Sequence, residues 1–327
     1  TNTLSFSFQR TIAIIGILLF IAKLVAWRLT QSDAIFSDAM ESIVNIIAGL
    51  MGLYSLFLSA KPKDQDHPYG HGKIEFVTSA IEGALIIFAG LMILMEASAS
   101  FFYPKTLQEL NWGMGIIGLT AIVNYILGYM AFQKGTKENS LVLQSTGKHL
   151  QSDTISTLGV VLSLLLVKLT NFYWLDALIA VLLGGYIIVE GYKIIRKAFS
   201  GIMDEKDEAL VAELVQALKQ DRRTEWIDIH NMKVQQFGAH LHIDAHITLP
   251  HYYSLSQAHR EMESVITTLL KHTKRTMEFN FHMDDCKPFS CEICQIDCPV
   301  RSKPFVKTID WTTENISQVQ KHSVENA

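Results

Sequence analysis

The sequence predicts an α-helical membrane protein with six transmembrane helices, joined to a smaller C-terminal α/β domain. Of the 327 residues, 49% are apolar and 18% are charged, and the mean hydropathy of +0.21 is high for a water-soluble chain of this size. The long apolar runs lie between residues 11 and 195, whereas the part from about residue 204 onward is charged and rich in histidine. We therefore divide the chain into a membrane domain over 1–203, a soluble domain over 204–285 and a cysteine-containing tail over 286–327.

Six segments are long and apolar enough to cross a bilayer as helices, since about 20 residues span roughly 30 Å of hydrocarbon. The first segment carries Lys23 and Arg28 at its far end and has no small-residue cleavage site, so we interpret it as a retained helix rather than a signal peptide. An even number of spans places both termini on one side of the membrane. The segments are 11–29, 34–60, 76–102, 112–132, 143–169 and 174–195.

The charged residues exclude one class of partner and orient the chain. With 28 basic and 32 acidic residues the net charge is −4, so we expect no binding to nucleic acid. The positive-inside rule places both termini and the soluble domain in the cytoplasm, with the helices in the cell (inner) membrane, because basic residues near the spans concentrate on the side of the termini. Those on that side are Arg10, Lys61, Lys63, Lys73, Lys134, Lys137, Lys148, Lys193, Arg196 and Lys197, against Arg28, Lys105 and Lys168 on the other.

The soluble domain has the sequence pattern of a small layered α/β fold in the order αββαβ. Phe237 and Gly238 separate two strand-like runs and fit a tight hairpin turn. After Pro299 the sequence is polar and lacks clear periodicity, so we expect a loosely ordered tail. The expected elements are a helix over 208–219, strands over 226–236 and 239–249, a helix over 255–272 and a strand over 276–282.

Two of the spans carry polar residues at helical spacing, where ionisable groups are costly and indicate function by default. Asp38, Glu41 and Asn45 lie at i, i+3 and i+7, and His149 and Asp153 at i and i+4, so each set occupies one stripe of its helix. Facing each other, the stripes would form a four-coordinate cage for a borderline divalent metal such as zinc. The alternative is that these groups only hydrogen-bond between helices, although neighbouring acids on one stripe repel each other unless a cation or proton lies between them.

Other charged residues in or near the spans stand alone. For these we expect a local partner or a side chain that extends to the membrane interface. We assign them no function. They are Lys23, Glu82, Glu96, Asp176 and Glu190.

Three motifs together resemble the cation diffusion facilitator family. The second span reads SDAMESIVN from Ser37, the loop after it reads HPYGHGK from His67, and the fifth span reads HLQSD from His149. The resemblance covers residues 8 to 285 and implies a dimeric six-helix transporter that exchanges a cytoplasmic divalent metal for protons, with a metallochaperone-like metal-binding domain in the cytoplasm. It also implies a transport site made by Glu41, Asn45, His149 and Asp153.

Two positions of this site depart from the commoner family pattern, which has an aspartate or histidine where Glu41 stands and an aspartate where Asn45 stands. An amide is a weak neutral ligand, so the cage lacks one negative charge, and we hypothesise that Asp38 supplies it directly or through water. The departure leaves zinc, iron(II) and manganese(II) open, although the imidazole of His149 favours zinc or iron. Protons compete with metal for an imidazole, whose ordinary pKa is about 6.5, so His149 also offers a route to proton coupling.

The loop after the second span matches a second metal position of the family at Asp64, His67 and His71. A carboxylate and two imidazoles suit a three-ligand zinc site. The alternative is a polar loop with incidental histidines. The resemblance further implies that Lys73, which ends the loop motif, pairs with Asp204 just after the last span.

The run 239–249 carries polar residues at alternate positions. His240, His242, Asp244 and His246 project to one side of a strand, and the apolar residues between them face the other. The alternative to a metal site is an exposed polar strand face. The resemblance implies a binuclear regulatory site made by His230, His242, His259, His282 and Asp284, with His246 as a nearby extra ligand.

Four cysteines follow the soluble domain with the spacing C-x4-C-x2-C-x3-C-Pro. So close a group is typical of ligation or redox chemistry rather than of a disulfide framework. A structural zinc held by all four thiolates is the first interpretation, paired or free thiols the second, and an iron–sulfur cluster in an iron-sensing exporter the third. The four are Cys286, Cys291, Cys294 and Cys298.

These patterns predict a homodimer in the lipid bilayer that exports a divalent metal, zinc in the first place and iron(II) or manganese(II) as alternatives, in exchange for protons. No nucleophile–base pair, Walker loop or GxGxxG motif accompanies the metal motifs, so we expect no enzyme. The rival interpretation is a membrane-anchored metal sensor or redox protein. A helical bundle that served only as an anchor would have no reason to carry polar stripes.

Overall fold

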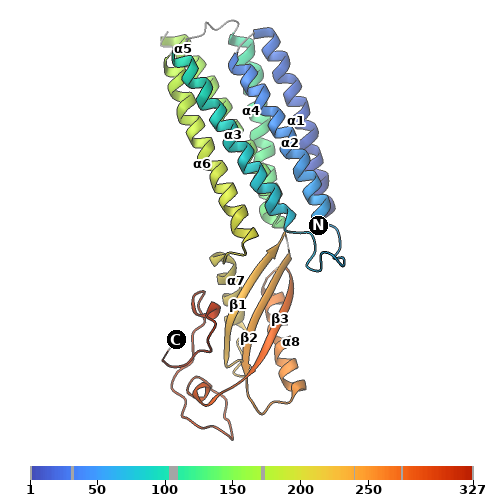
Figure 1. The fold of residues 1–327 in the computed structure, drawn as a ribbon, viewed down its shortest axis with the longest axis vertical. Coiled ribbons are helices and arrows are strands. Elements are labelled where there is room, and N and C mark those ends of the chain that lie inside the picture. Colours follow the sequence, from blue (N-terminus) through green and yellow to red (C-terminus); the bar gives the residue numbers. More distant parts are fainter. Residues whose placement is uncertain are drawn as a thin grey trace. The chain divides into compact units, whose positions relative to one another are not determined.

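The computed structural model describes residues 2–30, 33–102, 110–170, 174–238, 240–273 and 275–325. They form two compact units, Thr1–Met203 and Asp204–Ala327. The first unit is a bundle of six helices that lie side by side (Figure 1). This confirms the predicted six-helix architecture. The helices are α1 (Asn2–Thr30), α2 (Asp33–Ser59), α3 (Ile74–Phe102), α4 (Leu110–Glu138), α5 (Leu141–Thr170) and α6 (Trp174–Ile202).

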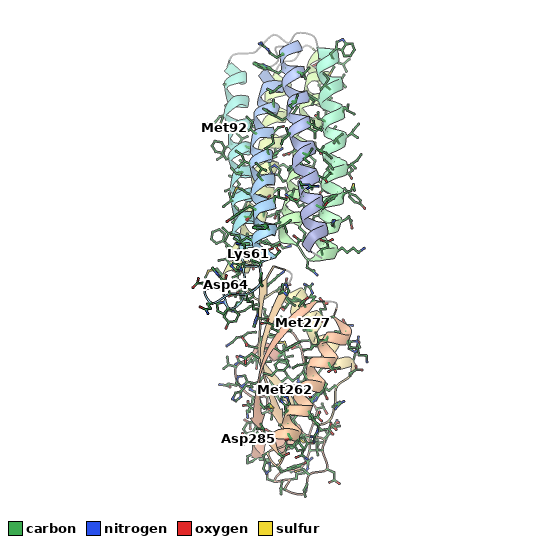
Figure 2. All side chains as sticks on the ribbon, turned by 90° about the vertical axis from the view of Figure 1, so that its right-hand side faces the viewer. Lys61, Asp64, Met92, Met262, Met277 and Asp285 are labelled. Atoms are coloured by element: carbon green, nitrogen blue, oxygen red, sulfur yellow. The ribbon has the colours of Figure 1, made fainter. Side chains whose placement is uncertain are left out.

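The bundle has apolar side chains outside and polar side chains inside. Leu18 and Met92 are 59% and 48% exposed, and Met92 projects from the surface of the bundle in Figure 2. Gln9, Lys23 and Glu82 are at most 1% exposed, so Lys23 does not extend to the membrane interface as predicted. Glu82 has a local partner, Thr146, which is one of the two outcomes expected for it. This arrangement suits a hydrocarbon solvent, in which polar groups must find partners within the protein. By length and composition, the described residues include three helical segments able to span a membrane: Ser7–Arg28, Ile74–Met95 and Met114–Glu138.

Glycines bring two pairs of helices into close contact. A Cβ atom at Gly191 on α6 would lie 2.8 Å from the carbonyl oxygen of Gly83 on α3, and one at Gly147 on α5 would lie 2.5 Å from the amide nitrogen of Phe132 on α4. Neither site has room for a side chain, which is the usual role of small residues between membrane helices. Gly147 therefore holds the start of α5 against α4 and fixes the position of His149, two residues later.

The second unit contains the predicted αββαβ order. The strands lie in the order β1-β2-β3, with β2 antiparallel to β1 and parallel to β3. Gly238 adopts a positive φ of 61° between β1 and β2, as the predicted tight turn requires. Asp207 caps the first helix by accepting hydrogen bonds from the amides of Ala209 and Leu210. The elements are α7 (Glu208–Gln220), β1 (Asp228–Phe237), β2 (His240–Leu249), α8 (Leu255–His272) and β3 (Thr276–Asp285).

The tail packs into the second unit and is not loosely ordered as predicted. Ile309, Trp311 and Ile316 are at most 3% exposed and belong to the hydrophobic core of the second unit. The guanidinium of Arg222 stacks 3.7 Å from the Trp311 ring centroid and donates a hydrogen bond to the carbonyl of Ile309. The expectation of a loosely ordered tail was therefore wrong. Its order comes from contacts with residues distant in the sequence, which periodicity does not reveal. Two short 3-10 helices, η1 (Pro288–Glu292) and η2 (Asn315–Ser317), lie in this region.

We expect Trp311→Ala to release the tail. Truncating a fully buried tryptophan costs about 3–5 kcal/mol, and here it also removes the stacking partner of Arg222. Amide hydrogen exchange of the full chain should show faster opening of the tail and of β1. Phe305→Ala, at a tail residue that is 44% exposed, is the matched control and should leave exchange unchanged. Equal exchange in the Trp311 variant and the parent would contradict this account.

Candidate metal sites

Three predicted site residues meet in the interior of the helical bundle. Asn45 on α2 donates a hydrogen bond from Nδ2 to Asp153 Oδ2 on α5, 2.5 Å away, and its Oδ1 contacts His149 Nε2. His149 Nε2 also lies 3.6 Å from Asp153 Oδ2. His149 and Asp153 are each 5% exposed. The two stripes predicted from the sequence therefore face each other through these residues.

The arrangement brings His149 Nε2 and Asp153 Oδ2 close together, with the amide group of Asn45 in contact with both residues. In a tetrahedral zinc site with bonds of 2.0–2.1 Å, neighbouring ligand atoms are about 3.3 Å apart. The separation of 3.6 Å between the imidazole nitrogen and the carboxylate oxygen is close to this value. The remaining predicted members of this site, Asp38 and Glu41, belong to α2, but their side chains lie outside the residues that the structure describes. Their roles as ligands stay predictions.

The loop between α2 and α3 brings Asp64, His67 and His71 together. Their ligand atoms all lie within 4.8 Å of one another. Asp64 Oδ1 is 3.0 Å from His67 Nδ1 and accepts the His67 amide, while Asp64 Oδ2 is 3.4 Å from His71 Nε2. The side-chain and backbone hydrogen bonds of His67 hold the pKa of Asp64 below its ordinary value. The carboxylate is therefore ready to bind a cation at neutral pH.

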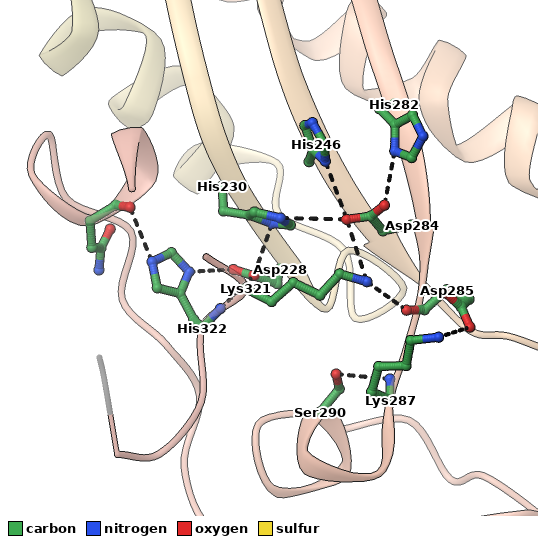
Figure 3. A network of polar contacts seen from close by, with 11 residues as sticks. Asp228, His230, His246, His282, Asp284, Asp285, Lys287, Ser290, Lys321 and His322 are labelled. Carbon is green, nitrogen blue, oxygen red and sulfur yellow. Dashed lines mark hydrogen bonds and ion pairs between the residues drawn. The ribbon is translucent and has the colours of Figure 1, made fainter. Parts of the chain in front are cut away.

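A row of three histidines crosses the sheet of the second unit. The strand register pairs His230 on β1 with His246 on β2, and His246 with His282 on β3. Asp284 joins them: its Oδ2 lies 3.4 Å from His230 Nε2 and 3.3 Å from His246 Nδ1, and its Oδ1 lies 2.8 Å from His282 Nδ1 (Figure 3). We call these four residues the sheet cluster. The ligand atoms of His230, His246 and Asp284 lie within the spacing that one metal ion requires.

The sheet cluster differs in membership from the set implied by the resemblance. His246, expected only as an extra ligand, lies at its centre. His242 lies four residues before it, about 13 Å along the strand, and pairs with Glu278 at 2.5 Å. His259 lies on α8 and pairs with Glu263 at 3.4 Å. Strand alternation puts residues 242 and 246 on the same face, so only the register with the neighbouring strands distinguishes them.

Asp228, Lys321 and His322 surround the cluster and were not predicted. Asp228 lies 3.2 Å from His230 Nδ1 and 2.5 Å from His322 Nδ1, and Lys321 Nζ lies 3.4 Å from Asp284 Oδ2 (Figure 3). Burial opposes ionisation of Asp228, but hydrogen bonds with His230 and His322 outweigh it and hold its pKa well below the ordinary value. The spacing of Asp228 and His230 on one strand was a usable signal. Lys321 and His322 of the tail gave none, since Lys321 is 37 residues from Asp284 and His322 is 94 residues from Asp228.

We expect His246→Ala to weaken zinc binding at the sheet cluster by at least about tenfold, because it removes the central ligand. His242→Ala is the matched control, with the same residue type on the same strand and face, and should stay within about twofold of the parent. Zinc affinity of the full chain can be measured by competition with a chromogenic chelator. A larger loss of zinc affinity in His242→Ala than in His246→Ala would restore the assignment implied by the resemblance, in which His242 is a ligand and His246 an extra one.

The four cysteines line one small pocket at the end of the sheet, and all are free thiols. Arg301 organises the segment by donating hydrogen bonds to the carbonyls of Cys291, Cys294 and Ile296. Among the described residues, two groups of three His, Cys, Asp or Glu side chains have their ligand atoms close enough together to hold a metal ion. They are Asp64, His67 and His71 in the loop, and His230, His246 and Asp284 in the sheet, so the thiols are in neither group. Zinc binding by the cysteines therefore stays a prediction. Lys73 and Asp204 belong to different units, and their pairing stays a prediction as well.

Comparison with known proteins matches both units. The family model of the cation efflux transmembrane domain covers residues 10–203, and that of the cytoplasmic domain of cation efflux proteins covers 207–286. An uncharacterized transporter of Synechocystis is 28% identical over 247 residues, which are 76% of this chain and 80% of the relative. The cation-efflux pump FieF of Shewanella oneidensis is 26% identical over 72% of this chain and 79% of its own. The manganese efflux system protein MneP of Bacillus subtilis is 25% identical over 76% and 85%.

Proposed function

Because this chain belongs to the cation diffusion facilitator family of cation-efflux transporters, we propose that it exports a divalent metal cation, zinc in the first place, from the cytoplasm in exchange for protons. The observation that carries the proposal is the convergence of Asn45, His149 and Asp153 in the polar interior of the bundle. Their ligand atoms have the chemistry of a site for a borderline divalent cation.

The donor set supports zinc over the alternatives. One imidazole and one carboxylate in a small site suit zinc or iron(II), whereas manganese(II) prefers all-oxygen sites. The amide oxygen of Asn45 is a weak, neutral ligand, which argues for moderate affinity and hence for ready release. Manganese(II) is the second candidate, since a relative of similar coverage is a manganese efflux protein. Iron(II) shares the ligand preference of zinc and is the third.

Proton exchange follows from the ligand types. Metal binds His149 only when Nε2 carries no proton, and it binds Asp153 only as the carboxylate, so metal and protons compete for the same atoms. When the cation leaves, the buried Asp153 carboxylate loses its counter-charge and is stabilised by taking up a proton, because an unpaired charge is costly in the bundle. Each transport cycle would therefore carry metal one way and protons the other.

We further propose a homodimer with both termini in the cytoplasm. Basic residues on the terminal side of the bundle support this orientation, and the match of the second unit to a cytoplasmic domain agrees with it. The Asp64 loop site and the sheet cluster would then bind cytoplasmic metal. Binding there would regulate transport by drawing the second units of the two protomers together.

The decisive experiment is transport by the purified protein in liposomes with a pH-sensitive dye inside. Zinc, iron(II), manganese(II), cadmium and cobalt should be offered in turn across a pH gradient. The proposal predicts that zinc moves fastest and that the lumenal pH changes only when a transported metal is present. Metal movement without any pH response would reject proton coupling, and equal rates for manganese and zinc would reject the zinc preference.

A further inference from the structure

A carboxylic acid outside the transport ligands lies at the centre of the bundle. Glu82, two turns into α3, is 1% exposed. Its Oε1 accepts a hydrogen bond from Thr146 Oγ1 on α5 at 3.2 Å, whereas Oε2 has no hydrogen-bond partner among the described residues. Thr146 in turn accepts a hydrogen bond from Gln9 Nε2 on α1 at 3.4 Å. One hydroxyl is too little to stabilise a buried negative charge, so the side chain is neutral while no cation is near.

Glu82 shares a cavity with two of the transport residues. A cavity of about 30 Å³, enough for a water molecule, is lined by Glu82, Asn45 and His149 together with apolar residues of α1, α2, α4 and α5. Asn124 of α4 is the other polar residue on its wall besides Thr146. The carboxyl group therefore faces the place where a cation would bind, without being one of its ligands.

We propose that Glu82 is a proton-binding residue of the exchange cycle, which releases its proton when a divalent cation enters the neighbouring site and takes a proton up when the cation leaves. This inference rests on the proposed function. The step breaks one carboxylic O–H bond. The proton passes to water in the shared cavity, and the electron pair stays on the carboxylate, where the negative charge faces the cation.

The residues around Glu82 allow its ionisation to follow the charge of the cation. Among the residues that the structure describes on the cavity wall, those from α2 and α4 are neutral and include Asn45 and Asn124. Gln9 of α1 is neutral and binds Thr146, and α6 packs on α3 through glycine and isoleucine. His149 is the other titratable residue of the described cavity wall, with Asp153 beyond it. Because Asn45 contributes no charge to the transport site, an ionised Glu82 supplies negative charge from a short distance.

The test is a count of the protons released when zinc binds. Purified full-length protein in weakly buffered detergent solution is titrated with zinc and a pH dye. Glu82→Gln keeps the shape and the hydrogen bond from Thr146, and it should release about one proton fewer per chain than the parent. Glu82→Asp should restore the count. Glu190→Gln, at a carboxylate that pairs with Lys193 on α6, is the matched control and should equal the parent.

An equal proton count in the parent and in Glu82→Gln would overturn the assignment and leave Glu82 as a structural acceptor. A parent that binds zinc and releases no protons would instead reject the proposed exchange itself. The other zinc sites of the chain do not affect the comparison, because they are the same in every variant.

A second measurement keeps the proposal testable if Glu82→Gln does not fold. Infrared difference spectra of the parent with and without zinc should lose the carbonyl band of a protonated carboxylic acid. Thr146→Val should shift the frequency of that band, because it removes the hydrogen bond to Oε1. A difference spectrum without such a band, or a band that Thr146→Val leaves unmoved, would contradict the assignment.

Discussion

We expect His149→Ala and Asp153→Ala each to abolish zinc transport while the protein still folds and dimerises. Each variant removes a proposed metal ligand at the place where α2 and α5 meet. Loss of a group that merely supports a metal ligand already costs about 10–100-fold, so loss of the ligand itself should lower the transport rate by more than about 100-fold. In each case the alanine also leaves an unpaired partner, since Asn45 contacts both residues.

The measurement is zinc uptake into liposomes at matched protein content, with size-exclusion chromatography as the check on folding and dimerisation. Ser152→Ala is the matched control, because Ser152 is also buried on α5, at 4% exposed, but makes none of the site contacts described here. It should transport at the rate of the parent. Transport at parental rate in either ligand variant would remove the bundle site from the proposed function.

Features that depend on local patterns could be predicted from the sequence. Hydrophobic length predicted six membrane helices, and alternation predicted the αββαβ order and the polar face of β2. The loop site could be predicted as well, because Asp64, His67 and His71 are close in sequence and turn residues separate them. The polar stripes on α2 and α5 were predictable since helical spacing fixes which residues share a face.

Features that depend on register and distant contacts could not be predicted. Strand alternation repeats every second residue and cannot tell His242 from His246. Only pairing with His230 and His282 places His246 in the sheet cluster. The burial of Trp311 depends on Arg222, about 90 residues earlier, and no sequence period connects the two. Glu82 was interpreted as isolated because its neighbour Thr146 is an uncharged residue on another helix.

Asn45→Asp should tighten zinc binding at the bundle site by about tenfold or more and slow zinc release. The amide of Asn45 now donates a hydrogen bond to Asp153 Oδ2 at 2.5 Å. A carboxylate in its place would bring two negative charges together, and without metal they could persist only by sharing a proton. Zinc relieves the repulsion of the two carboxylates and gains a stronger ligand than an amide, so the free energy of binding becomes more favourable. The same gain slows the dissociation of zinc from the bundle site, so the transport rate should fall as the zinc affinity rises.

The titration should be done in a background in which the loop site and the sheet cluster are removed by His71→Ala and His246→Ala and the predicted cysteine site by Cys291→Ser and Cys294→Ser, so that only the bundle site binds zinc. Asp38→Asn is measured beside it. If Asp38 already supplies the charge that Asn45 lacks, its loss should lower zinc affinity nearly as much as Glu41→Gln does. If Asp38 only stabilises the N-terminal end of α2 through the helix dipole, the zinc affinity of Asp38→Asn should stay within about twofold of the parent, or about 0.4 kcal/mol.

An unchanged zinc affinity in Asn45→Asp would mean that residue 45 is not a ligand. The metal would then be held by His149 and Asp153 with the acids of α2, and the contact of Asn45 with both would only position them.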